Sequence, residues 1–228
     1  MSTNTRIVEV RAKVLKQNDI LARSLRERFR SHGVYVVSLV SSPGSGKTTL
    51  LEKLLLHMSQ RYRVAALVGD LATENDAARL QRAASQVKQI TTGTICHLDA
   101  QMIEVALQPW DLSDLDFLFI ENVGNLVCPS SYDLGEDLRL VLLSATEGED
   151  KPLKYPTIFN SADVAVITKM DLAEAAEFDL RAARNNVESV RPGMTIFEVS
   201  SKTGTGLEDV IAFLLQSSRP RRAVEVSP

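Results

Sequence analysis

The sequence predicts an α/β protein with a single doubly wound, mainly parallel sheet and helices on both faces. Short, almost continuously apolar segments such as VYVVSLV (34–40) and LDFLFIE (115–121) alternate with amphipathic helical patterns. Strands of this kind are buried on both faces, as in parallel sheets covered by crossover helices. A third observation is the glycine-rich turn that separates the first strand from the next helix. Such a turn is typical of α/β folds that bind phosphate groups.

The totals fit one sizeable globular domain of 228 residues. A net charge of −3 argues against a general attraction to nucleic acid or to an anionic membrane. The longest apolar run, GVYVVSLV, is far too short to span a bilayer, and the first residues lack the pattern of a secretory signal. We therefore expect a cytoplasmic protein. Thiols stay reduced in that compartment, so we expect its two cysteines to be free thiols or metal ligands and not a disulfide.

Three regions follow along the chain. Residues 1–33 predict an N-terminal amphipathic helix packed on the domain, residues 34–216 the domain itself, and residues 217–228 a disordered tail. The helix is expected from Arg6 to Arg30 and ends before Gly33, which suits a helix terminus. Its apolar stripe consists of Ile7, Val10, Val14, Leu21, Leu25 and Phe29.

Seven strands and five further helices are expected after Gly33. The strands are VYVVSLV (34–40), RVAALVG (63–69), VKQIT (87–91), LDFLFIE (115–121), LRLVLLSA (138–145), DVAVITK (163–169) and TIFEVS (195–200). The helical patterns between them cover residues 47–60, 74–86, 98–107, 173–190 and 206–216.

The segment SSPGSGKTTLLEKL (41–54) is the strongest motif and predicts a P-loop NTPase. Its backbone N–H groups would surround phosphate oxygens at a helix N-terminus, where the helix dipole also favours negative charge. Lys47 would reach the outer phosphates and act in catalysis, and the Thr48 hydroxyl would bind Mg²⁺. The first glycine of the usual pattern is replaced by Ser41. The expected nucleotide-binding residues of this loop are Gly44, Ser45, Gly46, Lys47, Thr48 and Thr49.

A second group of residues favours guanine over adenine. Thr168-Lys169-Met170-Asp171 resembles the N-K-x-D motif of GTPases, with Thr168 in place of the usual Asn. The Asp171 carboxylate could accept hydrogen bonds from both N1–H and the exocyclic amine of guanine. Ser200, Ser201 and Lys202 resemble the S-A-K loop that also contacts the base.

Carboxylates at two strand ends are candidates for Mg²⁺ and for the attacking water. Glu121 and Gly124 resemble the D-x-x-G element that senses the γ-phosphate, with a longer carboxylate. Asp70 is the preferred ligand for Mg²⁺ or its bound water. Asp76 is either a residue that orients the attacking water or simply an acid in the first turn of a helix.

Cys96, His97 and Cys128 form a candidate metal site or are three ordinary residues. Both loops that contain them follow strands, so they can emerge at the same edge as the nucleotide. Two thiolates and an imidazole suit Ni²⁺ or Zn²⁺, and a fourth position would need water or a second subunit. Against this, free cysteines are often buried apolar residues, and no local C-x-x-C pattern is present. His32 and His57 have no neighbours of ligand type.

The motifs together resemble those of the hydrogenase nickel-incorporation GTPase family, HypB, from about Val36 to Leu215. The segments that carry the likeness are SSPGSGKTTLLEKL, GDLATENDAARL, TTGTICHLDAQMI, IENVGNLVCPSSYDLGE, EGEDKPLKYPTIF and SADVAVITKMDL. The stretches CHLDA and ENVGNLVCP separate the chain from the related urease accessory GTPase, which has a Cys-Pro-His motif.

The resemblance implies a GTPase that dimerises with GTP and assists nickel delivery to the [NiFe]-hydrogenase large subunit. It also implies GTP, Mg²⁺ and Ni²⁺ or Zn²⁺ as ligands, with Cys96, His97 and Cys128 binding metal near the dimer interface. A HypA-type nickel and zinc protein would be a partner, and Lys151 or Lys154 would reach across the dimer. The first 35 residues contain no cysteine and only His32, so the nickel-binding N-terminal motifs of some family members are absent.

Three other functions stay open on the sequence. The first is an ATP-dependent small-molecule kinase, against which Asp171 and the Ser200–Lys202 loop argue. The second is a metal-binding module with vestigial hydrolysis, which the departures at Ser41, Thr168 and Glu121 favour. The third is urease maturation, which the sequence around both cysteines disfavours.

Overall fold

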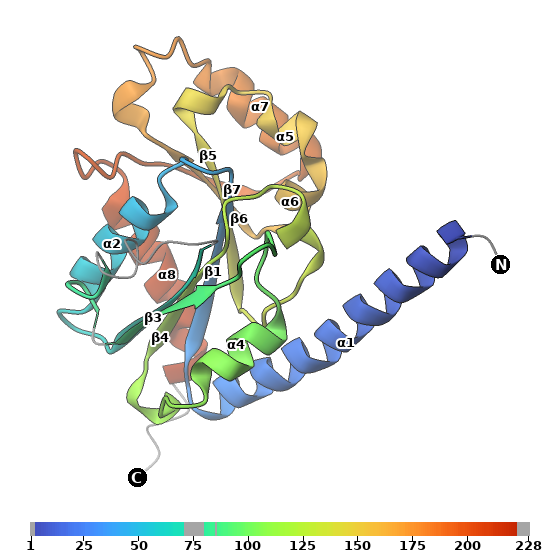
Figure 1. Ribbon diagram of the computed structural model, residues 1–228. Coiled ribbons are helices and arrows are strands. Elements are labelled where there is room, and N and C mark those ends of the chain that lie inside the picture. Colours follow the sequence, from blue (N-terminus) through green and yellow to red (C-terminus); the bar gives the residue numbers. More distant parts are fainter. Residues whose placement is uncertain (1–2, 71–79, 85, 223–228) are drawn as a thin grey trace.

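The computed structural model describes residues 3–70, 80–84 and 86–222. Its centre is a seven-stranded, all-parallel sheet with the order β3-β2-β4-β1-β5-β6-β7 (Figure 1). The strands are β1 (Tyr35–Ser41), β2 (Val64–Asp70), β3 (Gln86–Thr91), β4 (Phe117–Glu121), β5 (Leu138–Ser144), β6 (Val164–Thr168) and β7 (Thr195–Glu198). All seven expected strands are confirmed. Because they are parallel, the polar residues that end them meet at one edge of the sheet.

Helices cover both faces of this sheet, which confirms the doubly wound architecture. The helices are α1 (Thr3–Ser31), α2 (Lys47–Met58), α4 (Ala100–Leu107), α5 (Lys151–Lys154), α6 (Pro156–Ser161), α7 (Leu180–Val190) and α8 (Leu207–Arg222). On one face α2 and α8 pack on odd-numbered residues of β1, such as Val37 and Leu39. On the other face α1, α4, α6 and α7 pack on even-numbered residues, such as Val36 and Val40. This alternation follows from the two-residue period of a strand.

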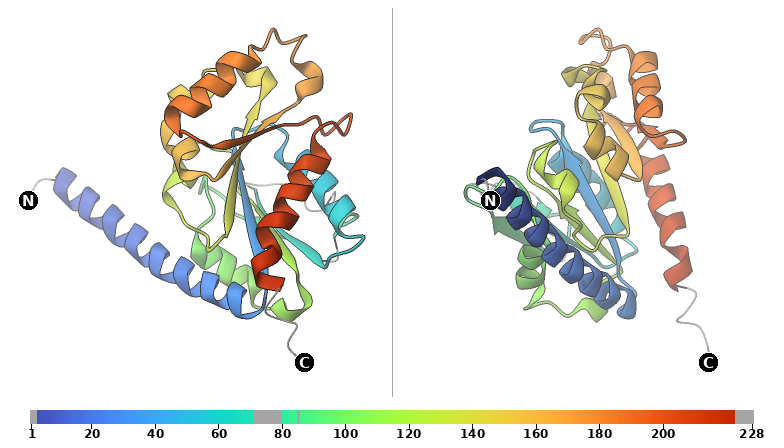
Figure 2. Two further views of the ribbon diagram at one scale, coloured as in Figure 1. Left: turned by 180° about the vertical axis from the view of Figure 1, so that it is seen from behind. Right: turned by 90° about the vertical axis from the view of Figure 1, so that its right-hand side faces the viewer.

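The N-terminal helix α1 projects from the body of the molecule (Figures 1 and 2). Its second half packs on the domain through Ala22, Leu25 and Phe29, which are fully or almost fully buried. In the outer half, however, Val10 is 56% and Val14 49% exposed. The predicted apolar stripe is therefore buried against the domain along only part of its length. Among the described residues, none of the helices is both long and apolar enough to span a membrane.

Three helix boundaries differ from expectation. Residues 173–177 form turns, and α7 begins only at Leu180, because the Asp179 carboxylate accepts the Ala182 N–H and caps the helix there. Helix α8 continues to Arg222, past residue 216, where the ordered part was expected to end. Of the helix expected over residues 74–86, residues 74–79 and 85 lie outside the described part, and β3 begins at Gln86.

Candidate nucleotide and metal site

The P-loop joins the end of β1 to the start of α2. Gly44 and Gly46 have φ angles of +75° and +89°, a left-handed conformation that favours glycine. Lys47 is buried, and its ammonium group donates a hydrogen bond to Ser41 Oγ at 2.8 Å. Ser45 Oγ donates to the Ser42 carbonyl at 2.7 Å and also contacts Ser41 Oγ. Ser41, which replaces a glycine of the usual motif, therefore lies inside the loop and positions Lys47.

The cavity beside the P-loop brings together the residues expected to bind Mg²⁺. It measures about 470 Å³, and its lining includes Lys47, Thr48, Asp70 and Glu121. Thr48 Oγ1 donates to Glu121 Oε1 at 2.7 Å, so the longer Glu121 carboxylate reaches the hydroxyl directly. Asp70 ends the neighbouring strand β2. A hydroxyl and two carboxylates are the hard oxygen donors that Mg²⁺ prefers, and the site fits this ion.

Asp76, the second candidate for handling the attacking water, lies outside the described residues. Gly44, Gly46, Thr49 and Gly124 line the same cavity as Lys47. Ser45 is fully buried beneath the loop, so its side chain faces the protein interior.

The position of Thr168 differs from the one expected for a base-reading residue. Its hydroxyl is buried and donates to the Ser45 carbonyl at 2.7 Å. It therefore ties the end of β6 to the P-loop and does not present its side chain to a base. Lys169 lines the nucleotide cavity, and its ammonium donates to the Gly44 carbonyl at 2.7 Å.

The guanine-reading candidate Asp171 is held by the loop after β7. Ser200 Oγ donates to Asp171 Oδ1 at 2.6 Å, and Ser200 is almost fully buried. Ser201 and Lys202 lie in the turn that follows, and Lys202 is exposed. Ser200 therefore orients the Asp171 carboxylate, which is itself exposed.

The two cysteines and His97 come together as one cluster. The ligand atoms of Cys96, His97 and Cys128 all lie within 4.8 Å of one another, and the two sulfur atoms are 2.9 Å apart. The His97 ring stacks on Tyr132 with centroids 3.9 Å apart, and its Nδ1 is buried without a hydrogen-bond partner. Burial lowers the pKa of His97, while the Asp99 carboxylate acts in the opposite direction. A lowered pKa favours the neutral imidazole, which is the form that binds metal.

The chain is similar to proteins of one nucleotide-binding family. The profile described as "CobW/HypB/UreG, nucleotide-binding domain" matches residues 35–198. The hydrogenase/urease maturation factor HypB of Helicobacter hepaticus is 44% identical over 217 residues, covering 93% of this chain and 89% of that protein. The chain belongs to the HypB family.

Two solved HypB structures have the same fold. HypB from Helicobacter pylori in complex with nickel is 46% identical, with a TM-score of 0.84 over 90% of this chain and 96% of that one. The hydrogenase maturation factor HypB from Archaeoglobus fulgidus is 40% identical, with a TM-score of 0.83 over 89% and 99% of the two chains. The expected fold class and family are thus confirmed along most of the chain.

In this HypB-family chain, one segment touches both the nucleotide cavity and the cysteine cluster. Glu121 contacts Thr48, and a Cβ added to Gly124 would lie 2.8 Å from Pro43 Cα of the P-loop. On the other side, Asn122 Oδ1 accepts the Leu98 N–H at 3.0 Å, next to His97. Asn125 Nδ2 donates to the Cys96 carbonyl at 3.3 Å. The segment from Glu121 to Cys128 is therefore a shared wall between the two sites.

The sequence did not identify Asn122 and Asn125 as functional residues. Both lie within ENVGN, directly after a strand, but the pattern does not tell which backbone groups their amides would meet. Asn122 is 2% exposed, and its amide oxygen accepts two backbone N–H groups, those of Leu98 and Val123. A polar side chain buried at the end of a parallel strand was the available signal.

Proposed function

We propose that this chain is a GTP-hydrolysing nickel metallochaperone that assists nickel insertion into [NiFe]-hydrogenase. Its partners would be a second copy of the chain, joined in the GTP state, a HypA-type nickel and zinc protein, and the hydrogenase large subunit. The observation that supports this proposal best is the wall shared by the nucleotide cavity and the cluster of Cys96, His97 and Cys128. A change at the γ-phosphate can act on the metal ligands through a few bonded residues.

The nucleotide half of the mechanism follows from the cavity. Lys47 would leave Ser41 for the phosphate oxygens and stabilise the charge that develops on them during hydrolysis. Thr48, with Asp70 and Glu121, would hold Mg²⁺, which supplies charge neutralisation at the β- and γ-phosphates. Because Thr48 and Glu121 share a hydrogen bond, rearrangement at Thr48 would reach the segment that follows Glu121.

The metal half uses that same segment. Movement of Glu121 would displace Asn122 and Asn125, whose amides hold Leu98 and Cys96 in place. Cys128 lies at the end of the segment, so its thiol would shift relative to Cys96 and His97. Nickel is the cargo in this scheme, and a three-ligand site open to a further ligand can accept and release it. Such coupling requires that nickel bind the two nucleotide states with different affinity.

The deciding experiment is a nickel titration of the purified chain with GDP and with a non-hydrolysable GTP analogue. We expect a different nickel affinity in the two states, by about fivefold or more, because allosteric coupling free energies are of that order. Asn125→Ala should reduce the difference, whereas Asn160→Ala, which removes an exposed amide from α6, serves as the control. Equal affinity in both states would reject the GTP-dependent step.

Guanine selectivity gives a separate prediction. Asp171→Asn should lower GTP affinity about tenfold or more, since hydrogen bonds to a charged group are worth about 1.5–3 kcal/mol. Xanthosine triphosphate, with a carbonyl where guanine has its amine, should bind the variant better than the wild type. Competition by GTP, ATP and xanthosine triphosphate against a fluorescent nucleotide measures both effects. Preference of the wild type for ATP would instead favour the kinase alternative.

Nickel delivery to urease shares the same chemistry, and the H. hepaticus relative has a name that covers both enzymes. The sequence around the cysteines therefore separates the two target enzymes less sharply than we expected. Restoration of hydrogenase and of urease activity in cells that lack their own factor would distinguish the targets.

A further inference from the structure

Helix α1 contacts both segments that bear the metal ligands. Asn18 lies in the middle of this helix and is buried, with 8% of its surface exposed. Its amide oxygen accepts the Ala100 N–H at 2.9 Å, and its amide nitrogen donates to the Asp133 carbonyl at 2.9 Å. Ala100 follows His97 by three residues, and Asp133 adjoins Tyr132, on which the His97 ring stacks. One side chain thus spans the gap between the Cys96–His97 segment and the segment after Cys128.

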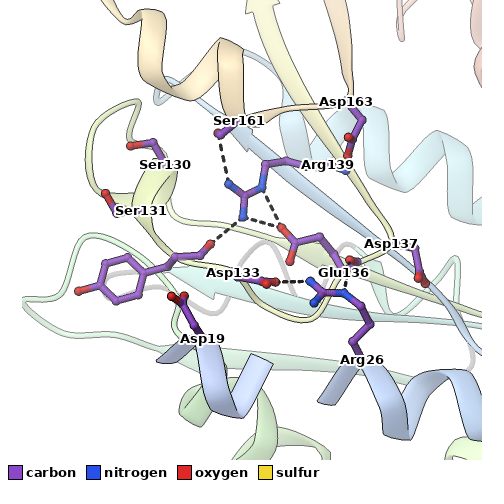
Figure 3. A pocket seen from close by; sticks show the side chains of 11 residues that line it. Asp19, Arg26, Ser130, Ser131, Asp133, Glu136, Asp137, Arg139, Ser161 and Asp163 are labelled. Atoms are coloured by element: carbon purple, nitrogen blue, oxygen red, sulfur yellow. Dashed lines mark hydrogen bonds and ion pairs between the residues drawn. The ribbon is translucent and has the colours of Figure 1, made fainter. Parts of the chain in front are cut away.

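A second residue of α1 holds the segment after Cys128 in the same place. The Arg26 guanidinium pairs with the Asp133 carboxylate at 2.5 Å and donates to the Glu136 carbonyl at 3.3 Å (Figure 3). Burial alone would raise the pKa of Asp133, but the hydrogen bonds from Arg26 and from the Gly135 N–H outweigh it and lower the pKa. The carboxylate is therefore charged at neutral pH, as the ion pair requires.

The backbone of this segment lies in close contact with α1 at Gly135. A Cβ added at Gly135, which has a φ of +81°, would lie 2.9 Å from the Ala22 carbonyl oxygen of α1. Arg139, at the start of β5, bonds the Tyr132 carbonyl at 2.6 Å and pairs with Glu136 at 2.6 Å (Figure 3). The segment from Tyr132 to Glu136 is thereby fixed between α1 and the sheet.

We propose that Asn18 is a positioning residue for the metal centre, which makes α1 part of its supporting structure. Its two hydrogen bonds set the spacing between the Cys96–His97 segment and the segment after Cys128, which contains Tyr132. This spacing determines the position of the His97 ring. The inference rests on metal binding at Cys96, His97 and Cys128, as proposed above. Groups behind the direct ligands fix ligand orientation, and their loss commonly weakens metal binding. Asn18 acts on both sides of the ligand set at once.

Asn18→Asp tests this role selectively. The aspartate keeps an oxygen for the Ala100 N–H but loses the N–H that bonds Asp133, and it places a carboxylate against a carbonyl oxygen. Gln17→Glu is the matched control, because it makes the same amide-to-acid change at the adjacent, exposed position of α1. We expect nickel affinity to fall about tenfold in Asn18→Asp, at the lower end of the effects known for such supporting groups. The thiolate-to-nickel absorbance of Asn18→Asp should also shift, while its GDP affinity stays at the wild-type value. In Gln17→Glu, nickel affinity and absorbance should both match the wild type.

A measurement without metal separates this inference from the proposed function. The rate at which a disulfide reagent labels Cys96 and Cys128 in the metal-free protein reports the position of both segments. We expect faster labelling in Asn18→Asp, and in Arg26→Gln should the first variant fail to fold. Wild-type labelling, nickel affinity and absorbance in a folded variant would overturn the inference and leave the proposed function intact. Weak nickel binding by the wild type, with no thiolate band, would reject the metal function, and changed labelling would then show only that Asn18 positions the two cysteine-bearing segments.

Discussion

Lys47→Ala should lower the rate of GTP hydrolysis by about 10²–10³-fold, the usual cost of removing one donor that stabilises developing negative charge. The Lys47 ammonium is buried in the wall of the nucleotide cavity and is held by Ser41 Oγ at 2.8 Å. Alanine cannot replace this charge, and neighbouring Lys169 already donates a hydrogen bond to the Gly44 carbonyl. Phosphate release from GTP, measured at saturating nucleotide, gives the rate.

Lys53→Ala is the control for this variant, because it removes an exposed lysine from the same helix, α2. Its rate should match the wild type. Thermal unfolding of both variants would show that the fold is kept. Hydrolysis that persists at the wild-type rate in Lys47→Ala would mean that the P-loop does not carry out the reaction, and the turnover would have to come from another source.

Cys128→Ala should abolish the thiolate-to-nickel absorbance and weaken nickel binding by about 100-fold or more. Loss of a group that merely supports a ligand can cost up to about 100-fold, and loss of a ligand should cost at least as much. The chain contains only two cysteines, so a thiolate band can come only from Cys96 and Cys128. With their sulfur atoms 2.9 Å apart, both should contribute to it.

The histidines supply the matched pair for this test. His97→Ala should weaken nickel binding, because its imidazole lies within 4.8 Å of both sulfur atoms. His57→Ala, which removes an exposed imidazole from α2, should leave binding unchanged. Equal nickel affinity in Cys128→Ala and the wild type would show that the metal binds elsewhere, and the two thiols would then be structural.

The five inner strands of the sheet were predictable because they are buried on both faces and consist of largely apolar segments, whereas the edge strands β3 and β7 are only partly buried. Every strand, from Tyr35 to Glu198, was expected within a few residues of its position. The P-loop was equally clear, since a left-handed turn requires glycine at positions 44 and 46. Such features depend on local chemistry, which a sequence records directly.

The site was harder to predict where contacts join distant segments. Thr168 looked like a base-reading residue, but its hydroxyl bonds the carbonyl of Ser45, 123 residues earlier in the chain. Asn18 is 82 residues from Ala100, its hydrogen-bonding partner. Such pairs follow from how the strands and helices assemble, and the hydrophobic periodicity of the sequence does not indicate them. The turns at residues 173–177 have another cause, since Glu177 has a φ of +51°, which interrupts the apparently helical pattern, and a helix begins only after the cap at Asp179.

The separation of the two thiols has a consequence for the newly made chain. Cys96 and Cys128 are 32 residues apart, and strand β4 lies between them. A contiguous Cys-x-x-Cys motif can hold metal in an unfolded chain, whereas this pair meets only after β4 has joined the sheet. Metal binding of this kind is coupled to folding. Nascent or misfolded copies would therefore leave the cell's nickel pool untouched, and only a folded molecule could take up its cargo.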